Sequence, residues 1–156
     1  MDKFELKYRF TEEEVKLLPL EDLSKIHPLN KLGEAIVYQK IYDLKIRKGY
    51  QLNPEYFSSI IQLNMKSVSG KEIMTWLNDH KIDANRKILL VWDSWGTVIT
   101  EWHIFKKYYE DFFFPVSDDL TIIDKSLSWA LYIFHEEIMS FGRNDDIILS
   151  RPKKLM

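Results

Sequence analysis

The chain has 156 residues, of which 46% are hydrophobic, 14% aromatic and 29% charged. This length and composition predict one folded domain and exclude a disordered or low-complexity protein. Because the chain contains no cysteine, disulfides, thiol nucleophiles and thiolate metal sites are excluded.

The formal net charge of −2 hides an asymmetry between two parts of the chain. Residues 1–91 carry 15 basic and 13 acidic side chains, whereas residues 92–146 carry 4 basic and 11 acidic ones. Phosphate binding requires lysine and arginine, so the second part is not expected to bind nucleic acid. An acidic surface suits a cationic partner, although acidic side chains that merely solvate the surface explain the balance equally well.

The first part of the chain has the residue spacing of helices. The stretch TEEE (residues 11–14) is a capping box, which predicts a short helix that begins at Thr11 and stops near Pro19. A second helix, which Gly49 would end, is predicted from apolar residues at helical spacing: Leu32, Ile36, Val37, Ile41 and Leu44.

Two further helices are predicted before residue 81. Asn53 as N-cap and Pro54 at the first helical position favour a helix with the apolar face Phe57, Ile60, Ile61 and Met65. Ser69 and Glu72 form another capping box, and the core-facing residues of that helix are Ile73, Trp76 and Leu77. Two short helices joined by a turn also resemble a DNA-binding helix-turn-helix, but an ordinary helical hairpin fits the mixed charges better.

The second part of the chain changes character. Short apolar or alternating runs predict strands near residues 88–92, 120–123, 129–134 and 137–141. Between the first two, a helix with Thr100 as N-cap is expected, with one face formed by Trp102, Phe105, Tyr109 and Phe112. The fold prediction is therefore a single α+β domain over residues 1–156. Its N-terminal helices (about 11–80) would pack on a small, mainly antiparallel sheet from a β-α-β-β-β part (about 87–142).

The stretch ALYIFHEEIMSFGR contains the most conspicuous polar cluster, His135, Glu136 and Glu137. A zinc-protease motif would need a second histidine at position 139, which is methionine, so we expect no metal here. The cluster lies where two alternating runs meet, which predicts a hairpin turn. A competing interpretation makes residues 126–139 one amphipathic helix.

Other chemistry has little support. Adjacent carboxylates such as Asp118 and Asp119 point to opposite faces of a strand, so they do not form a natural acid–base pair. No glycine-rich phosphate loop and no nucleophile elbow occur, and no cofactor is expected. The basic cluster from Lys40 to Lys48 is interpreted as the solvated end of a helix.

A family resemblance takes the interpretation further. The strings WGTVITEW, FKKYYEDFFFPVSDDLTI and WALYIFHEEIMSFG, within residues 92–143, resemble small bacterial immunity proteins of contact-dependent growth-inhibition and other polymorphic toxin systems. The resemblance implies a non-enzymatic cytoplasmic protein that binds one secreted toxin tightly and neutralises it. Many such toxins are nucleases with basic active sites, so an acidic surface with aromatic rings would complement them.

The sequence thus leaves two functional hypotheses. The first is an immunity-type inhibitor of a cationic protein toxin, with these candidate contact residues: Asp93, Trp95, Glu101, Trp102, Glu110, Asp118, Asp119, Glu136 and Glu137. The second is a small hydrolase or metal-assisted enzyme that uses His135 and nearby carboxylates. The N-terminus has no signal-peptide pattern and no window is apolar enough to span a bilayer, so a cytoplasmic location is expected. The sequence does not predict the oligomeric state.

Overall fold

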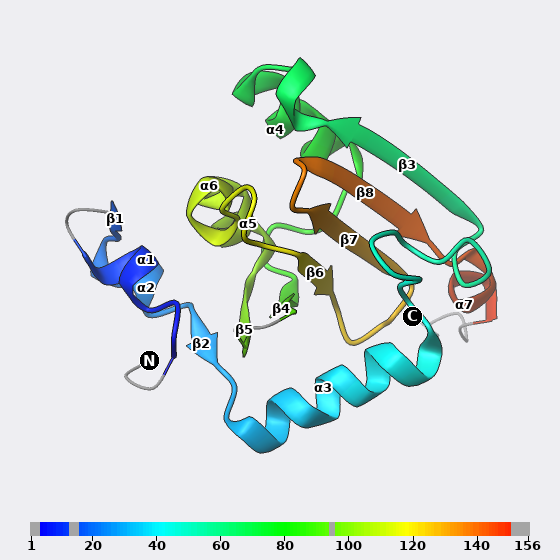
Figure 1. Ribbon diagram of the computed structural model, residues 1–156, viewed down its shortest axis with the longest axis horizontal. Coiled ribbons are helices and arrows are strands. Elements are labelled where there is room, and N and C mark those ends of the chain that lie inside the picture. The colour runs from blue at the N-terminus through cyan, green and yellow to red at the C-terminus, as the bar shows by residue number, and fades with distance from the viewer. Residues whose placement is uncertain (1–3, 13–15, 94–95, 151–156) are drawn as a thin grey trace, which may run out of the picture.

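The computed structural model describes residues 4–12, 16–93 and 96–150 and has an α+β fold (Figure 1). The helices are α1 (Tyr8–Thr11), α2 (Leu20–Leu23), α3 (Lys31–Leu44), α4 (Gly70–Asp79), α5 (Trp102–Lys107), α6 (Tyr109–Phe112) and α7 (Asp145–Ser150), with a 3₁₀ turn η1 (Met65–Ser67). The strands are β1 (Lys16–Leu17), β2 (His27–Pro28), β3 (Ser59–Asn64), β4 (Lys87–Trp92), β5 (Gly96–Glu101), β6 (Leu120–Ile123), β7 (Trp129–Phe134) and β8 (Ile138–Arg143).

Seven strands form one antiparallel sheet in the order β2-β5-β4-β6-β7-β8-β3. The predicted strands correspond to β4, β6, β7 and β8, and the antiparallel α+β class is confirmed. The hairpin between β7 and β8 pairs Phe134 with Ile138, so residues 126–139 are not a helix. Strands β6 and β7 are buried along almost their whole length, which explains their nearly continuous apolar sequences.

The sheet separates two apolar cores, because successive side chains of a strand point to opposite faces. On one face, Leu90 and Trp92 join a large aromatic core with side chains from α1, α4, α5 and α6. On the other face, Ala130 and Tyr132 join a smaller core, against which the α3 residues Val37, Ile41 and Leu44 are packed.

Helix α3 ends earlier than the sequence predicts. The Asn30 side chain caps it by accepting a hydrogen bond from the Gly33 N–H at 2.8 Å. The helix ends before Lys45, which adopts the left-handed conformation, so Gly49 is not the stop. Two residues of the predicted core stripe, Leu32 and Ile36, are exposed.

Helix α4 follows the sequence prediction closely. The Ser69 hydroxyl accepts a hydrogen bond from the Glu72 N–H and contacts the Glu72 carboxylate, which is the expected capping box. Ile73 and Leu77 are buried, and Trp76 packs against the core at its edge.

The predicted helix over residues 53–65 is wrong, and with it the helix-turn-helix interpretation. The Asn53 side chain accepts a hydrogen bond from the Glu55 N–H at 3.0 Å, which closes a tight turn instead of starting a helix. The following residues form β3, whose six residues all pair with β8. Pairing with a distant strand therefore outweighs the local helix signal, and the β-branched Ile60 and Ile61 favour that outcome.

Two other boundaries also differ from the sequence prediction. Thr11 ends α1 instead of starting a helix, and its hydroxyl donates to the Lys7 carbonyl at 3.0 Å. Residues 13 and 14 of that capping box lie outside the described part of the chain. Thr100 is not an N-cap either, because it lies in β5 and pairs with Ile88 of β4. The helical segment after it is divided at Tyr108 into α5 and α6.

Candidate functional site

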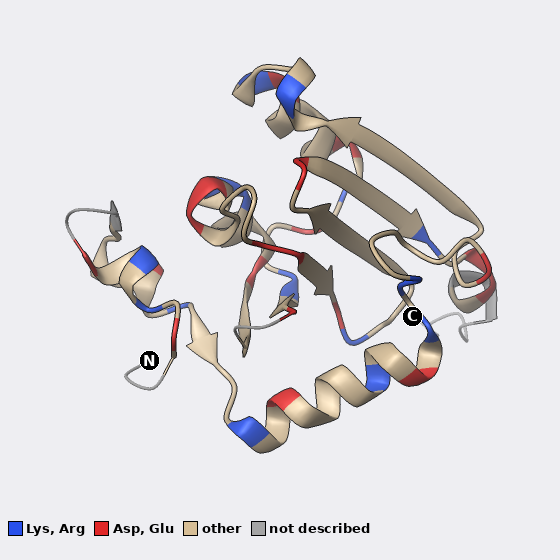
Figure 2. Ribbon diagram, viewed as in Figure 1, with Lys and Arg blue, Asp and Glu red and all other residues tan. Residues whose placement is uncertain are grey.

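Four of the candidate carboxylates gather at one end of the sheet, which we call the acidic end: Asp93, Asp119, Glu136 and Glu137. Asp93 directly follows β4 and Asp119 directly precedes β6, and the Asp93 N–H donates to the Asp119 carbonyl at 3.1 Å. Glu136 and Glu137 form the turn between β7 and β8. Figure 2 shows this turn and the segment before β6 as acidic. The antiparallel pairing of β4 with β6, β6 with β7 and β7 with β8 brings these strand ends together.

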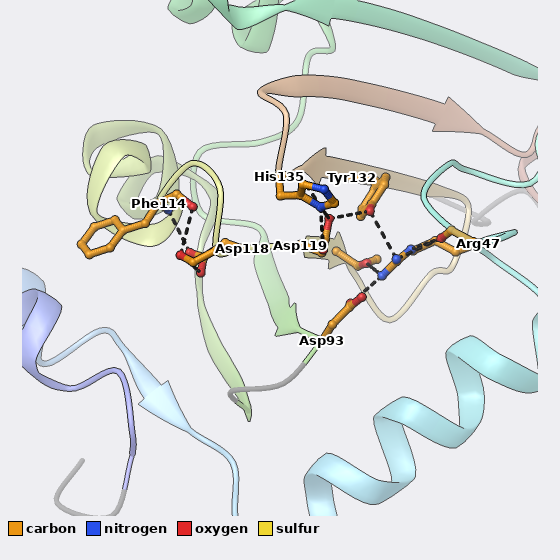
Figure 3. A network of polar contacts seen from close by, with 10 residues as sticks. Arg47, Asp93, Phe114, Asp118, Asp119, Tyr132 and His135 are labelled. Atoms are coloured by element: carbon orange, nitrogen blue, oxygen red, sulfur yellow. Dashed lines mark hydrogen bonds and ion pairs between the residues drawn. The ribbon is translucent and has the colours of Figure 1, made fainter.

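Asp119 is the centre of a hydrogen-bond network (Figure 3). Its carboxylate accepts from the Tyr132 hydroxyl at 2.8 Å and from the His135 N–H at 3.2 Å. Both carboxylate oxygens lie 3.1 Å from His135 Nδ1. The hairpin position predicted for His135 is confirmed, and the carboxylate fixes the orientation of its imidazole ring.

Arg47 attaches the segment after α3 to the same network. Its guanidinium lies 2.5 Å from Asp93 Oδ1 and donates to the Tyr132 hydroxyl at 3.3 Å. It also lies 4.1 Å from the centre of the Tyr132 ring. Asp93 therefore has its charge balanced by Arg47, and burial raises the pKa of the Tyr132 hydroxyl above its ordinary value.

A cavity of about 440 Å³ lies beside Arg47, between the C-terminal half of α3 and the sheet. Its walls include Tyr38, Tyr42, Val91 and Thr121. The Tyr38 hydroxyl donates to a backbone carbonyl of β4, and burial, followed by the charge of Asp93, raises the pKa of Tyr38 to about 12. Tyr38 is therefore a neutral hydrogen-bond donor and not a proton-transfer group near pH 7.

Glu136 and Glu137 are the two carboxylates of the acidic end that lie in the β7–β8 turn. Within the described residues, neither carboxylate makes an ion pair. Glu137 has a positive φ of 66°, and its N–H donates to the Phe134 carbonyl at 2.8 Å, which fixes the turn. The turn therefore holds its negative charge in one backbone conformation.

Two exposed apolar groups flank this turn. Val116 is 85% exposed and has a φ of 75°, an unfavourable conformation for a β-branched residue, while its N–H donates to the His135 carbonyl at 2.9 Å. Tyr50 is 62% exposed, and its ring lies 5.2 Å from that of His135. We call Tyr50, Val116, His135, Glu136 and Glu137 the turn patch.

Two of the candidate contact residues are not on the surface. Asp118 is fully buried in an ion pair with Arg9, at 2.5 and 3.0 Å, and also accepts from the Phe114 N–H at 2.8 Å. Trp102 is fully buried, with Trp129 at a ring distance of 5.8 Å. Both predictions of a surface role are corrected, because these side chains hold the core together.

The remaining three candidates lie elsewhere. Glu101 is at the opposite end of β5, where its carboxylate is 3.8 Å from the Lys87 ammonium and 3.5 Å from His103 Nε2. Glu110 is exposed on α6. Trp95 lies outside the described residues.

Sequence reasoning missed the roles of Arg47, Tyr50 and Val116. Arg47 was visible only as part of a basic helix end, and nothing local connects it with Asp93. Val116 follows a proline and precedes Ser117, which indicates a loop but not its exposure.

The described part of the chain contains no group of three His, Asp or Glu side chains that could hold a metal ion. None of its helices has the length and apolar character needed to cross a membrane. Comparison of the chain with protein-family models, with curated proteins and with solved structures finds no match.

Proposed function

We propose that this chain is an immunity-type inhibitor, which binds a cationic protein toxin in the cytoplasm through the turn patch. The observation that carries the proposal is the pair Glu136 and Glu137, which make no ion pair with any described residue and directly follow His135, the residue that the exposed Tyr50 and Val116 both contact. Exposed charge accelerates the encounter with an oppositely charged partner, and rings and aliphatic groups supply affinity once they are buried.

Rigidity is the second support for this proposal. The turn patch is attached to the segment before β6 through the Asp119 carboxylate, and the hydrogen bond from Val116 to His135 links two of its own loops. A preformed surface loses little conformational entropy on binding, which favours a tight complex. We infer that α1 and α3 support this end of the sheet from opposite faces, through Arg9 and through Arg47 just after α3.

The test is a pair of charge reversals, Glu136→Lys with Glu137→Lys. The matched control reverses Glu21 and Glu55, which are exposed, carry the same charge and lie outside the turn patch. Binding to the product of a toxin gene adjacent to this gene would be measured by stopped-flow mixing at low and physiological salt. We expect the association rate constant to fall by about tenfold for the patch variant and to change little for the control. Equal rates for both variants would contradict the proposal.

The enzyme hypothesis rests on one specific observation, the contact between Asp119 and His135 Nδ1 at 3.1 Å. In hydrolases a carboxylate on Nδ1 orients a histidine whose Nε2 receives a proton from a nucleophile. Among the described residues, no serine or threonine hydroxyl is hydrogen-bonded to His135 Nε2. The variant His135→Gln separates the two functions, because an enzyme would lose activity by orders of magnitude, whereas an inhibitor that still presents Glu136 and Glu137 would lose only part of its protection against the toxin.

A further inference from the structure

The two edges of the sheet are built differently. The edge strand β2 has only two residues, and one of them is Pro28. Short length and proline are devices that prevent an edge from pairing with another chain. The other edge, β3, has six residues, Ser-Ile-Ile-Gln-Leu-Asn, with no proline and no charge. It forms the outer margin of the sheet in Figure 1, and no described strand pairs with its outer side.

The outward-facing backbone groups of β3 follow from its register. The Met65 N–H donates to the Glu137 carbonyl at 2.9 Å, in line with the pairing of Asn64 with Ile138. Hydrogen-bonded and non-hydrogen-bonded pairs alternate along an antiparallel ladder. The N–H and C=O groups of residues 59, 61 and 63 therefore face β8, and those of Ile60, Gln62 and Asn64 face outward.

We propose that β3 pairs antiparallel with β3 of a second copy of this chain, so that the two sheets become continuous. The outward groups belong to even-numbered residues, so hydrogen-bonded pairs must join even to even. The register that uses the whole strand places Gln62 opposite Gln62 on a two-fold axis and Ile60 opposite Asn64. A two-fold axis is the commonest symmetry of homo-oligomers.

The side chains of this register favour a second copy as the occupant. The register sets Ile61 of one copy opposite Leu63 of the other, in a non-hydrogen-bonded pair where side chains approach closely. Ile61 is 51% exposed, and Leu63 lies at the margin of the large core, so pairing removes apolar surface from water on both sides of the axis. The net charge of −2 per chain opposes association only weakly.

The flanks of the strand are also complementary. The same register brings the Lys66 end of one strand to the Ser58 end of the other. The Ser58 hydroxyl donates to the Asp145 carboxylate at 2.8 Å, so a carboxylate lies where the lysine arrives. The contact area is small, so we expect a dimer that dissociates on dilution.

The test uses one substitution that removes an outward N–H and a matched one that keeps it. Gln62→Pro removes the N–H at the two-fold axis without removing a hydrogen bond to β8, whereas Gln62→Thr retains that N–H. Both variants lose the side-chain hydrogen bond from Gln62 to Ser140, so a difference between them does not come from that bond. Sedimentation velocity over a hundredfold range of protein concentration gives the oligomeric state, and circular dichroism verifies the fold.

We expect the unaltered chain and Gln62→Thr to form dimers at high concentration, and Gln62→Pro to remain monomeric. If Gln62→Pro does not fold, Ile61→Lys serves the same purpose, because it places a charge in the apolar pair. Hydrogen exchange should slow with rising concentration at the amides of Ile60, Gln62 and Asn64. A monomer at every concentration, or a dimer that survives Gln62→Pro and Ile61→Lys, would overturn the proposal. Protection of these amides only on addition of a toxin would also overturn it, in favour of a strand from that partner.

Discussion

Replacing Asp118 with asparagine should unfold the chain far more readily than its small chemical change suggests. The Asp118 side chain is 0% exposed and its partner Arg9 is 3% exposed, so the substitution leaves a guanidinium charge buried without a counter-charge. Asparagine keeps one oxygen for the Phe114 N–H, which isolates the effect of charge. Removing one partner of a buried pair costs about 3–5 kcal/mol, a large share of a total stability of about 5–15 kcal/mol.

Urea unfolding measures this loss directly. With a slope of about 2 kcal/mol per molar urea, a loss of about 4 kcal/mol lowers the midpoint by about 2 M. Asp43→Asn, at an exposed carboxylate on α3, is the control and should change the free energy of unfolding by less than about 0.5 kcal/mol. Combining Asp118→Asn with Arg9→Met should recover part of the loss, because no unpaired charge remains. A cost below about 1 kcal/mol for Asp118→Asn would refute the buried, charge-dependent contact.

Three further predictions concern other parts of the chain. Burial, followed by the charge of Arg143, lowers the pKa of His80 to about 4, below the ordinary value of 6.5. His80 is therefore neutral in the folded state, and its contribution to stability is present above pH 6.5 and lost as the pH falls towards 4. Urea unfolding at pH 7.5 and pH 5 measures this effect. Between these two pH values the free energy of unfolding should fall less for His80→Phe than for the unaltered chain, and an equal fall in both would contradict the prediction. Gly142→Ala should destabilise the fold by about 1–3 kcal/mol, because the added Cβ would lie 2.6 Å from the Phe57 ring. The control Gly70→Ala should be tolerated, and similar urea midpoints for the two variants would contradict the close packing at Gly142. Val116→Gly should stabilise the fold by up to about 1 kcal/mol, because glycine adopts the positive φ without strain, and it should weaken toxin binding. Thermal unfolding measures the first effect and titration calorimetry the second. Unchanged binding would exclude Val116 from the interface.

The elements predicted correctly from the sequence are those whose secondary structure is indicated by neighbouring residues. The apolar runs of β4, β6, β7 and β8 and the capping box of α4 depend on neighbouring residues alone. Strands β3 and β5 were missed because their pairing with β8 and β4 decides between helix and strand. The same limit applies to the core stripe of α3, where Leu32 and Ile36 have helical spacing but are left exposed by the described part of the chain.

The candidate site shows the same limit at the level of single residues. Asp118 and Asp119 are adjacent and chemically identical, yet one is fully buried against Arg9 and the other binds His135 at the edge of the turn patch. The difference is set by an arginine 109 positions away, which no local pattern reveals. The count of charged residues predicts that the second part of the chain is acidic. Only the strand topology shows which of its carboxylates lie together at one end of the sheet.

The position of β3 has a consequence for how the chain is made in the cell. Its partner strand β8 lies about 85 residues later in the sequence, and synthesis at about 5–20 residues per second leaves β3 without that partner for about 4–17 s. The strands from β4 to β8 pair with one another over shorter sequence distances and can form first, so the N-terminal segments must dock onto them afterwards. During that interval both edges of an uncharged six-residue strand are open to other nascent chains. We therefore expect the yield of folded protein to depend on chaperones that shield this segment until β8 has left the ribosome.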